Sequence, residues 1–337
     1  MQEVKISEIL PKLNKVQKAQ NSKITNGKSF IFKDGRVFSY SNDSFVSAKL
    51  PVDLGTFAVS SDKLLPFLKK NIANTFEVSI EDNALVFKRG TKTASFVLES
   101  IEIKLEDYLP TDEPKQEVSS VFLEGIMQAS LVAIKSALQS KQEVYMYVCV
   151  DGGNITATDG MRFIKYETEN NLKGRYFLKA ATLLKYDISN VSQISQNERF
   201  VYLFDEEDTI YGIPTAQGDT LHLATADRML KEVIGTGDKI DIPLEITDNV
   251  DDIITIYDSA NTFSVKIKDH KISTLYTSES VKYKGTEPIE HDGYLHFSIA
   301  PSIFKSVIVN NTAHIKDNLL CFISDNMFYL TCIAKEE

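Results

Sequence analysis

Cysteine is scarce in this sequence, and long apolar segments are missing. Its three cysteines, Cys149, Cys321 and Cys332, are an odd number and form no Cys-x-x-Cys pair. This excludes a disulfide framework and favours buried, inert thiols in a reducing compartment. The absence of any run of about 18 apolar residues excludes a membrane-spanning helix. The first ten residues lack the basic start and apolar core of a secretory signal peptide, so we expect a cytoplasmic protein.

Positive charge is in the minority. The chain has 37 Lys and Arg residues against 47 Asp and Glu residues, which gives a net charge of −10. This balance excludes a protein that coats nucleic acid through bulk charge, but it permits a local basic surface on an acidic body. The 337 residues, 43% hydrophobic and 25% charged, are typical of a globular protein of two or three domains.

Motifs of enzymes and metal sites are also missing. The sequence contains no phosphate-binding GxxxxGK[ST] loop, no GxGxxG after a strand and no GxSxG elbow. Its five histidines are scattered without the spacing of zinc ligands. The acidic run 205–208 lies between two strand-like segments, so we expect a solvated turn and not a cation site. We therefore expect no metal, no cofactor and no catalytic activity, and we favour a binding or scaffolding role.

A threefold internal repeat is the main positive signal. Phe57, Phe177 and Phe297 lie 120 residues apart, and each belongs to a short alternating strand followed by an amphipathic stretch of about three turns. Alternating segments that read as antiparallel strands come next in each copy, at residues 76–100, 199–225 and 313–334. Helical spacing at residues 6–20, 123–139 and 244–257 precedes hairpin turns at residues 34–35, 151–152 and 269–270.

The repeat predicts an α+β fold of three domains. Each domain would consist of a helix, hairpin strands, a short helix and more hairpin strands. An acidic, proline-containing segment at 99–117 and a glycine-rich segment at 234–241 mark the joins. We place the domains at residues 1–113, 114–236 and 237–337.

The segment 141–163 resembles a known family. Residues 142–148, Gln-Glu-Val-Tyr-Met-Tyr-Val, and 157–163, Ala-Thr-Asp-Gly-Met-Arg-Phe, resemble the middle domain of the bacterial sliding clamp, the beta subunit of DNA polymerase III. Residues 8–19 resemble the first helix of that family more loosely. The resemblance implies three clamp domains, with helices lining a hole and antiparallel sheets outside. It also implies a head-to-tail homodimeric ring that encircles double-stranded DNA without reading its sequence, and that binds DNA polymerase and clamp loader through short peptide motifs.

Candidate DNA contacts come from the first helix and from the resemblance. Lys12, Lys15 and Lys18 recur every three residues and would form one basic side of a helix. The resemblance adds Lys23, Gln142 and Tyr147. The predicted DNA-binding residues are Lys12, Lys15, Lys23, Gln142 and Tyr147. Lysines of the short helices could contribute as well, namely Lys63, Lys69, Lys70, Lys179, Lys185 and Lys305. The alternative interpretation is that these lysines form only the solvated faces of amphipathic helices.

The resemblance also implies a partner-peptide groove and a dimer interface. The groove would be lined by Val148, Thr158, Gly160, Met161, Arg162, Phe163, Val233, Leu330, Cys332 and Ile333. The dimer interface would include Phe96, Leu98, Ile256 and Tyr257. The alternative for both sets is that their apolar members pack the cores of their own domains.

Three features depart from the family pattern. Met161 replaces the histidine of Asp-Gly-His-Arg, and the chain ends in Cys-Ile-Ala-Lys-Glu-Glu where the family has a Met-Pro-Met-Arg-Leu-like ending. The third copy of the first helix has no Lys or Arg between residues 241 and 258, which is unusual for a helix that faces phosphates. The competing functions are a β-rich repeat protein that builds a structural assembly and a hydrolase that uses scattered carboxylates.

Overall fold

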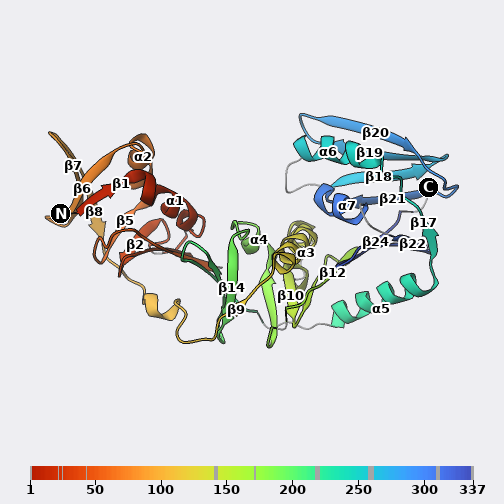
Figure 1. The fold of residues 1–337 in the computed structure, drawn as a ribbon, viewed down its shortest axis with the longest axis horizontal. Coiled ribbons are helices and arrows are strands. Elements are labelled where there is room, and N and C mark those ends of the chain that lie inside the picture. Colours follow the sequence, from red (N-terminus) through yellow and green to blue (C-terminus); the bar gives the residue numbers. More distant parts are fainter. Residues whose placement is uncertain are drawn as a thin grey trace. The chain divides into compact units, whose positions relative to one another are not determined.

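The structure is a computed structural model that describes residues 2–21, 23–24, 26–42, 44–139, 143–170, 172–216, 221–256, 262–308 and 312–334. Its element order repeats three times along the chain (Figure 1). The first copy contains β1 (Gln2–Lys5), α1 (Ile6–Gln17), β2 (Ser29–Lys33), β3 (Arg36–Ser41), β4 (Ser44–Lys49), β5 (Phe57–Ser60), α2 (Ser61–Lys70), β6 (Thr75–Glu81), β7 (Ala84–Arg89), β8 (Lys92–Glu99) and the 3-10 helix η1 (Leu105–Asp107).

The second and third copies follow the same order with local additions. The second contains β9 (Gln116–Glu117), α3 (Ser120–Gln139), η2 (Glu143–Met146), β10 (Tyr147–Asp151), β11 (Asn154–Thr158), β12 (Arg162–Glu167), β13 (Arg175–Lys179), α4 (Ala180–Leu183), β14 (Val191–Gln196), β15 (Phe200–Asp205), β16 (Thr209–Pro214) and α5 (Leu221–Thr236). The third contains β17 (Asp238–Ile240), α6 (Ile246–Ile256), β18 (Phe263–Lys268), β19 (Lys271–Thr277), β20 (Lys282–Pro288), β21 (Leu295–Ile299), α7 (Pro301–Ile308), β22 (Thr312–Lys316), β23 (Leu319–Ile323) and β24 (Met327–Cys332).

The strand pairing confirms the predicted repeat. The orders β5-β2-β3-β4, β13-β10-β11-β12 and β21-β18-β19-β20 are equivalent, and so are β1-β6-β7-β8, β9-β14-β15-β16 and β17-β22-β23-β24. Two joints between these groups are formed. Strand β4 pairs with β16 in a 12-stranded sheet, and β12 pairs with β24 in an 8-stranded sheet, while β18–β21 form a separate 4-stranded sheet.

The chain forms two compact units, each made of separate segments. One contains Met1–Val118 and Lys185–Thr215, and the other contains Ser119–Leu184 and Ala216–Glu337. The 12-stranded sheet lies in the first unit, and the other two sheets lie in the second. The three domain boundaries taken from the repeat stay a prediction.

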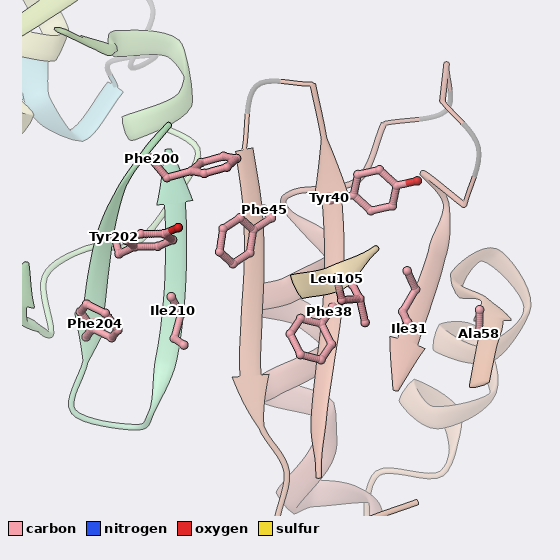
Figure 2. Close-up of a cluster of buried hydrophobic side chains, with 10 residues drawn as sticks. All are labelled: Ile31, Phe38, Tyr40, Phe45, Ala58, Leu105, Phe200, Tyr202, Phe204 and Ile210. Carbon is pink, nitrogen blue, oxygen red and sulfur yellow. The ribbon is translucent and has the colours of Figure 1, made fainter. Parts of the chain in front are cut away.

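An aromatic cluster holds the joint between β4 and β16 in the first unit (Figure 2). The ring of Phe45 contacts those of Phe200 and Tyr202, with centroids 5.7 and 6.1 Å apart. Gly212 lies opposite Phe45, and a Cβ atom on Gly212 would come within 1.9 Å of the Phe45 ring. The glycine therefore leaves the space in which the Phe45 ring lies across β16.

In the second unit, α3 and α5 cover opposite faces of the β10–β12 sheet. Tyr166 faces α3, where its hydroxyl donates to the Glu124 carboxylate at 3.0 Å. Phe163, which points to the other face of β12, belongs to a buried cluster with Leu230 and Val233 of α5. Because neighbouring side chains on a strand point to opposite faces, β12 contributes to both layers.

Several predicted elements differ from the observed ones. The expected three-turn helix after β13 is only the four-residue α4, and the predicted strand through Leu221 and Leu223 is the start of α5. The 221–236 segment has apolar residues at both helical and alternating spacings, so local pattern alone did not separate the two. No helix in the described part of the chain is long and apolar enough to span a membrane.

Candidate functional site

A cavity of about 290 Å³ lies where β12, β24 and β21 meet in the second unit. Four residues of the predicted groove line it: Met161, Arg162, Cys332 and Ile333. Its other lining residues were not predicted from the sequence; they are Asp159, His296, Phe297, Ser298, Thr331 and Ala334. Chain pairing brings these distant segments together, because Arg162 lies opposite Thr331 in the sheet and the Ala334 amide donates to the His296 carbonyl at 2.8 Å.

A tight turn before β12 positions the Met161 and Arg162 side chains. One carboxylate oxygen of Asp159 accepts hydrogen bonds from the amides of Met161 and Arg162, at 3.0 and 2.8 Å. The Thr158 hydroxyl donates to the Arg162 carbonyl at 2.6 Å and accepts from the Gly160 amide at 3.1 Å. Gly160 has φ +87°, a conformation that side chains with a Cβ rarely adopt. Thr158 and Gly160 thus shape the turn.

Arg162 provides a buried charge beside the cavity. The residue is 6% exposed, and its guanidinium is ion-paired with Asp159. Its Nη1 atom and the Tyr329 hydroxyl are enclosed and have no hydrogen-bond partner of normal geometry among the described residues. Burial raises the pKa of Tyr329 to about 12, so this hydroxyl stays neutral at physiological pH.

The mouth of the cavity is apolar with a few polar groups. Met161 is 63% exposed, which leaves its thioether available for contact. The chain after β24 is fixed by backbone bonds from Cys332 to Met161 and from Ile333 to Asn318, at 3.0 and 2.8 Å. His296 Nε2 lies 2.6 Å from the Ser264 hydroxyl. Such a site suits an extended peptide with apolar side chains.

The other predicted groove residues pack inside the protein. Val148, Phe163, Val233 and Leu330 are each at most 4% exposed, and the last three belong to the cluster beneath α5. In this structure Phe163 and Leu330 lie beneath the apolar face of α5, Val233 is on that face, and Val148 points to the opposite side of its sheet. Their place in a partner groove stays a prediction. Burial raises the pKa of Cys149 to about 11 and of Cys321 to about 12, as expected for inert thiols.

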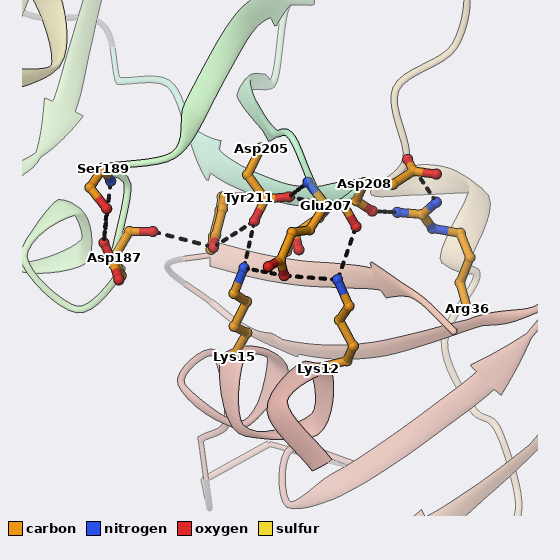
Figure 3. Close-up of polar contacts among 10 residues, drawn as sticks. Lys12, Lys15, Arg36, Asp187, Ser189, Asp205, Glu207, Asp208 and Tyr211 are labelled. Carbon is orange, nitrogen blue, oxygen red and sulfur yellow. Dashed lines mark hydrogen bonds and ion pairs between the residues drawn. The ribbon is translucent and has the colours of Figure 1, made fainter. Parts of the chain in front are cut away.

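Lys12 and Lys15 point toward the acidic turn between β15 and β16 (Figure 3). Lys12 Nζ lies 2.8 Å from Glu207, and Lys15 Nζ lies 2.8 Å from Asp205 and 2.9 Å from Glu207. The Asp205 side chain is only 1% exposed and also accepts hydrogen bonds from the amides of Glu207 and Thr209. The turn is solvated at Glu206, Glu207 and Asp208, as predicted, but Asp205 is buried, and the two lysines form ion pairs with this turn.

This acidic turn should stabilise the first unit. We expect Asp205→Asn to lower the free energy of unfolding by about 2–4 kcal/mol, because it leaves the Lys15 ammonium without its buried partner. Glu207→Gln should cost less than about 1 kcal/mol, because the Glu207 side chain is 51% exposed. Urea unfolding of the two variants measures both values. Equal losses would contradict a special role for the buried carboxylate.

The pH dependence of this contact follows from Glu207. Hydrogen bonds from Lys12 and Lys15 lower the pKa of Glu207 to about 2. A lowered carboxylate pKa stabilises the fold at pH values above the unfolded pKa. The contribution is lost as the pH falls through about 2, so the ion pairs persist across the physiological range.

The remaining predicted DNA contacts lie in different surroundings. Lys23 is exposed in the loop after α1, whereas Tyr147 packs against the cluster on the α5 side of its sheet. Gln142 lies outside the described residues. On α2, the lysines at positions 63, 69 and 70 are exposed and form no ion pair within the described part of the chain. On α7, Lys305 is paired at 2.5 Å with Asp251, one of the three aspartates of α6.

The edges of β8 and β20 lack a partner strand over most or all of their length in the described structure, as do other strands that end a sheet, such as β17. Strand β8 pairs with β7 along its length, but with β5 only at Leu98 and Glu99. Strand β20 ends its 4-stranded sheet. The Leu98 amide donates to the Asn83 carbonyl at 3.0 Å, so the alternate residues Thr93, Ser95 and Val97 direct their backbone groups away from β7. Thr93 and Ser95 lie on the part of this edge that β5 leaves open. In the same way, the Ser278 amide donates to the Val281 carbonyl across the β19–β20 turn. The alternate residues Lys282, Lys284 and Thr286 of β20 therefore direct their backbone groups away from β19, toward the open edge.

The predicted interface residues lie near these edges. Phe96 is half-buried against Phe67 and Phe87, with ring centroids 5.3 and 5.8 Å apart, and Leu98 is half-buried. Val97, which was not among the predicted interface residues, is 72% exposed. Ile256 is 37% exposed at the end of α6, and Tyr257 lies outside the described residues.

Within the described ranges, no group of three or more His, Cys, Asp or Glu side chains is arranged to hold a metal ion. The candidate sites are therefore a peptide-sized cavity in the second unit, the exposed lysines of α2 in the first unit, and the open edges of β8 and β20.

Comparison with known proteins identifies the fold. No protein-family model matches the sequence, and no curated protein matches it. Among solved structures, the DNA polymerase III beta subunit of Thermotoga maritima is 16% identical with a TM-score of 0.68, and that of the Streptococcus pyogenes polymerase is 12% identical with a TM-score of 0.69. The Helicobacter pylori beta clamp bound to a DNA ligase peptide is 11% identical with a TM-score of 0.68.

Each of these comparisons covers 99% of this chain and 99% of the other. The class that the fold defines is that of three-fold repeated, α+β clamp proteins. More particularly, the chain has the fold of the bacterial DNA polymerase III beta subunit, as the resemblance in segment 141–163 predicted.

Proposed function

We propose that this protein is a DNA sliding clamp, a non-enzymatic processivity factor that encircles duplex DNA and tethers a DNA polymerase and other partners. Two chains would form a head-to-tail ring in the cytoplasm, with three clamp domains per chain at residues 1–113, 114–236 and 237–337. DNA polymerase, clamp loader and similar partners would bind by short peptides in the cavity beside Met161 and Ile333. The fold and the open strand edges support this proposal.

The incomplete third joint is the observation that carries the proposal. Phe45 lies opposite Gly212 in the first joint, and Phe163 lies opposite Leu330 in the second. Lys284 occupies in β20 the position that Phe45 occupies in β4 and Phe163 in β12. Each lies four residues before the last residue of its strand that pairs with the preceding strand; these last residues are Pro288, Lys49 and Glu167. Ser95 is likewise equivalent to Leu330, two residues before Val97 and Cys332 respectively.

A second chain can supply the missing strand in this register. With Ser95 opposite Lys284 of the other chain, the outward backbone groups of β8 meet those of β20. Lys92 then lies opposite Glu287, which pairs opposite charges across the strands. A head-to-tail contact of this kind generates a closed ring if its rotation closes and a filament if it does not.

Retention on DNA separates a ring from the alternatives. The protein, loaded with a clamp loader, should remain on nicked circular DNA and slide off after the circle is linearised. Loss from both forms at equal rates would contradict encirclement. A filament seen by light scattering, without topological retention, would instead support the structural-assembly alternative.

The α2 lysines and Lys23 are the better candidates for DNA contact. They are exposed and unpaired among the described residues, whereas Lys12 and Lys15 are held by Asp205 and Glu207. Contacts of these lysines with phosphates would be independent of base sequence and sensitive to salt.

This assignment predicts a difference between two sets of variants. Changing Lys63, Lys69 and Lys70 to Glu should weaken DNA retention and reduce the slope of log affinity against log salt by about 0.9 for each phosphate that is no longer neutralised. Changing Lys12 and Lys15 to Gln should lower stability and leave that slope nearly unchanged. The measurement is fluorescence anisotropy with duplex DNA over a range of salt. The opposite pattern would return the DNA-binding role to α1.

A further inference from the structure

We infer that the edge strand β17 and the cleft beside it form a second docking site, which binds an extended peptide with apolar side chains and Lys or Arg flanks. The cleft has a volume of about 630 Å³ in the second unit. It lies between β17 and the following residues 241–243 on one side, and the β18–β19 turn and residues 288–291 on the other. It shares no lining residue with the cavity beside Met161.

The cleft has an apolar floor and an apolar wall. Ile240 and Ile289 are each 5% exposed and close its floor. Ile242, Pro243 and Pro288 line the wall and are at least partly accessible. Leu244, which follows Pro243 in the chain, is 57% exposed. Apolar surface gathered around a cleft is typical of a binding site, whereas single exposed apolar residues are not.

The backbone beside the cleft can accept another strand. Strand β17 pairs with β22 on one side and ends the 8-stranded sheet on the other. In the described part of the chain, the amides of Asp241 and Ile242 make no backbone hydrogen bond. An extended peptide can add to such an edge through main-chain bonds, with every second side chain entering the cleft.

Charge selects the kind of peptide. Asp241 and Glu290 are exposed at the rim and form no ion pair among the described residues. Next to the rim, the carboxylate of Asp292 is 90% exposed and lies 2.9 Å from His270. Lys239 is the one lysine among the residues that line the cleft. The rim is therefore acidic at neutral pH, and it attracts a peptide with basic flanks.

A charge exchange tests this site. The probes are two synthetic peptides, Lys-Lys-Val-Thr-Val-Thr-Val-Lys-Lys and the same sequence with Glu in place of Lys, with blocked ends. We expect the wild-type protein to bind the Lys-flanked peptide at least tenfold more tightly. The double variant Asp241→Lys, Glu290→Lys should reverse that preference. A reversal is a gain of binding, so it cannot result from misfolding.

The controls separate this site from the proposed clamp function. The double variant Glu279→Lys, Asp325→Lys changes two exposed acids outside the cleft and should keep the wild-type preference. Met161→Glu should leave binding of both peptides unchanged, since it alters only the other cavity. Equal affinities for the two peptides, no binding up to millimolar concentration, or a preference that the exchange leaves unchanged would overturn the inference. Hydrogen-exchange protection at β8 or β20, and not at residues 239–243, would also overturn it.

Discussion

Replacing Ser95 by proline is expected to convert the proposed dimer into folded monomers. Ser95 lies on the open edge of β8, and its amide points away from β7, so proline removes no hydrogen bond within the chain. The ring of proline would block the approach of β20 from a second chain and remove one of the outward donors. We expect the dimer dissociation constant to rise at least about 100-fold, which corresponds to about 2.7 kcal/mol.

Analytical ultracentrifugation over a range of concentrations measures this change. Ser95→Ala, which keeps the amide, should remain dimeric and serves as the matched control. Far-UV circular dichroism should show that Ser95→Pro keeps its strands. A dimer of unchanged affinity in the proline variant would exclude β8 from the interface and with it the proposed third joint.

The second large effect is expected for Met161→Glu. Met161 is 63% exposed at the mouth of the cavity, so a charged side chain there should leave folding intact. A carboxylate at this position would oppose the entry of apolar peptide side chains, because burying it without a partner costs several kcal/mol. We expect a peptide with Gln, Leu and Phe anchors to bind the wild-type protein at micromolar concentration and the variant at least tenfold more weakly.

Isothermal titration with that peptide provides the measurement. Ile72→Glu is a suitable control, because Ile72 is an apolar residue of similar exposure, 50%, in the first unit. The control variant should bind as the wild type does, and both variants should stay dimeric. If Met161→Glu keeps full affinity, the peptide must bind elsewhere.

The sequence predicted the fold well, because the fold is periodic. Phe57 begins β5, and Phe177 and Phe297 lie at the centres of β13 and β21, so each belongs to the corresponding strand of its copy. The hairpin turns at 34–35 and 269–270 lie where the sequence pattern indicated them, and the middle turn is at 152–153, one residue later than predicted. The pattern could not give the length of α4 or the helical state of residues 221–236, because those depend on what packs against them. The alternation of apolar and polar residues indicates which face of a strand is buried, but it does not indicate which element covers that face.

The site was predicted less completely, for a physical reason. Met161, Arg162, Cys332 and Ile333 line one cavity, as expected for the groove, but Phe163 and Leu330 are covered by α5, and Val233 lies on the buried face of that helix. His296 was missed because its place in the cavity depends on the path of the chain after β24, which no local signal reports.

The acidic turn shows the same limit of local patterns. The pairing of Lys12 and Lys15 with Asp205 and Glu207 joins residues about 190 positions apart in the sequence. Helix periodicity reports only which side of α1 is polar, so it suggested a free basic face. Only the strand pairing of β4 with β16 brings the acidic turn to that face.

The three equivalent joints differ in how they can open. Those at Phe45 and Phe163 join parts of one polypeptide, so the effective concentration of their partner strands is high at any dilution. These two joints also contain aromatic side chains, whereas the equivalent residues of the proposed third joint are Ser95 and Lys284. A ring assembled from this chain would thus contain four permanent seams and two that break reversibly. Mechanical strain applied anywhere on such a ring would part it at β8 and β20, which makes these strands its gate.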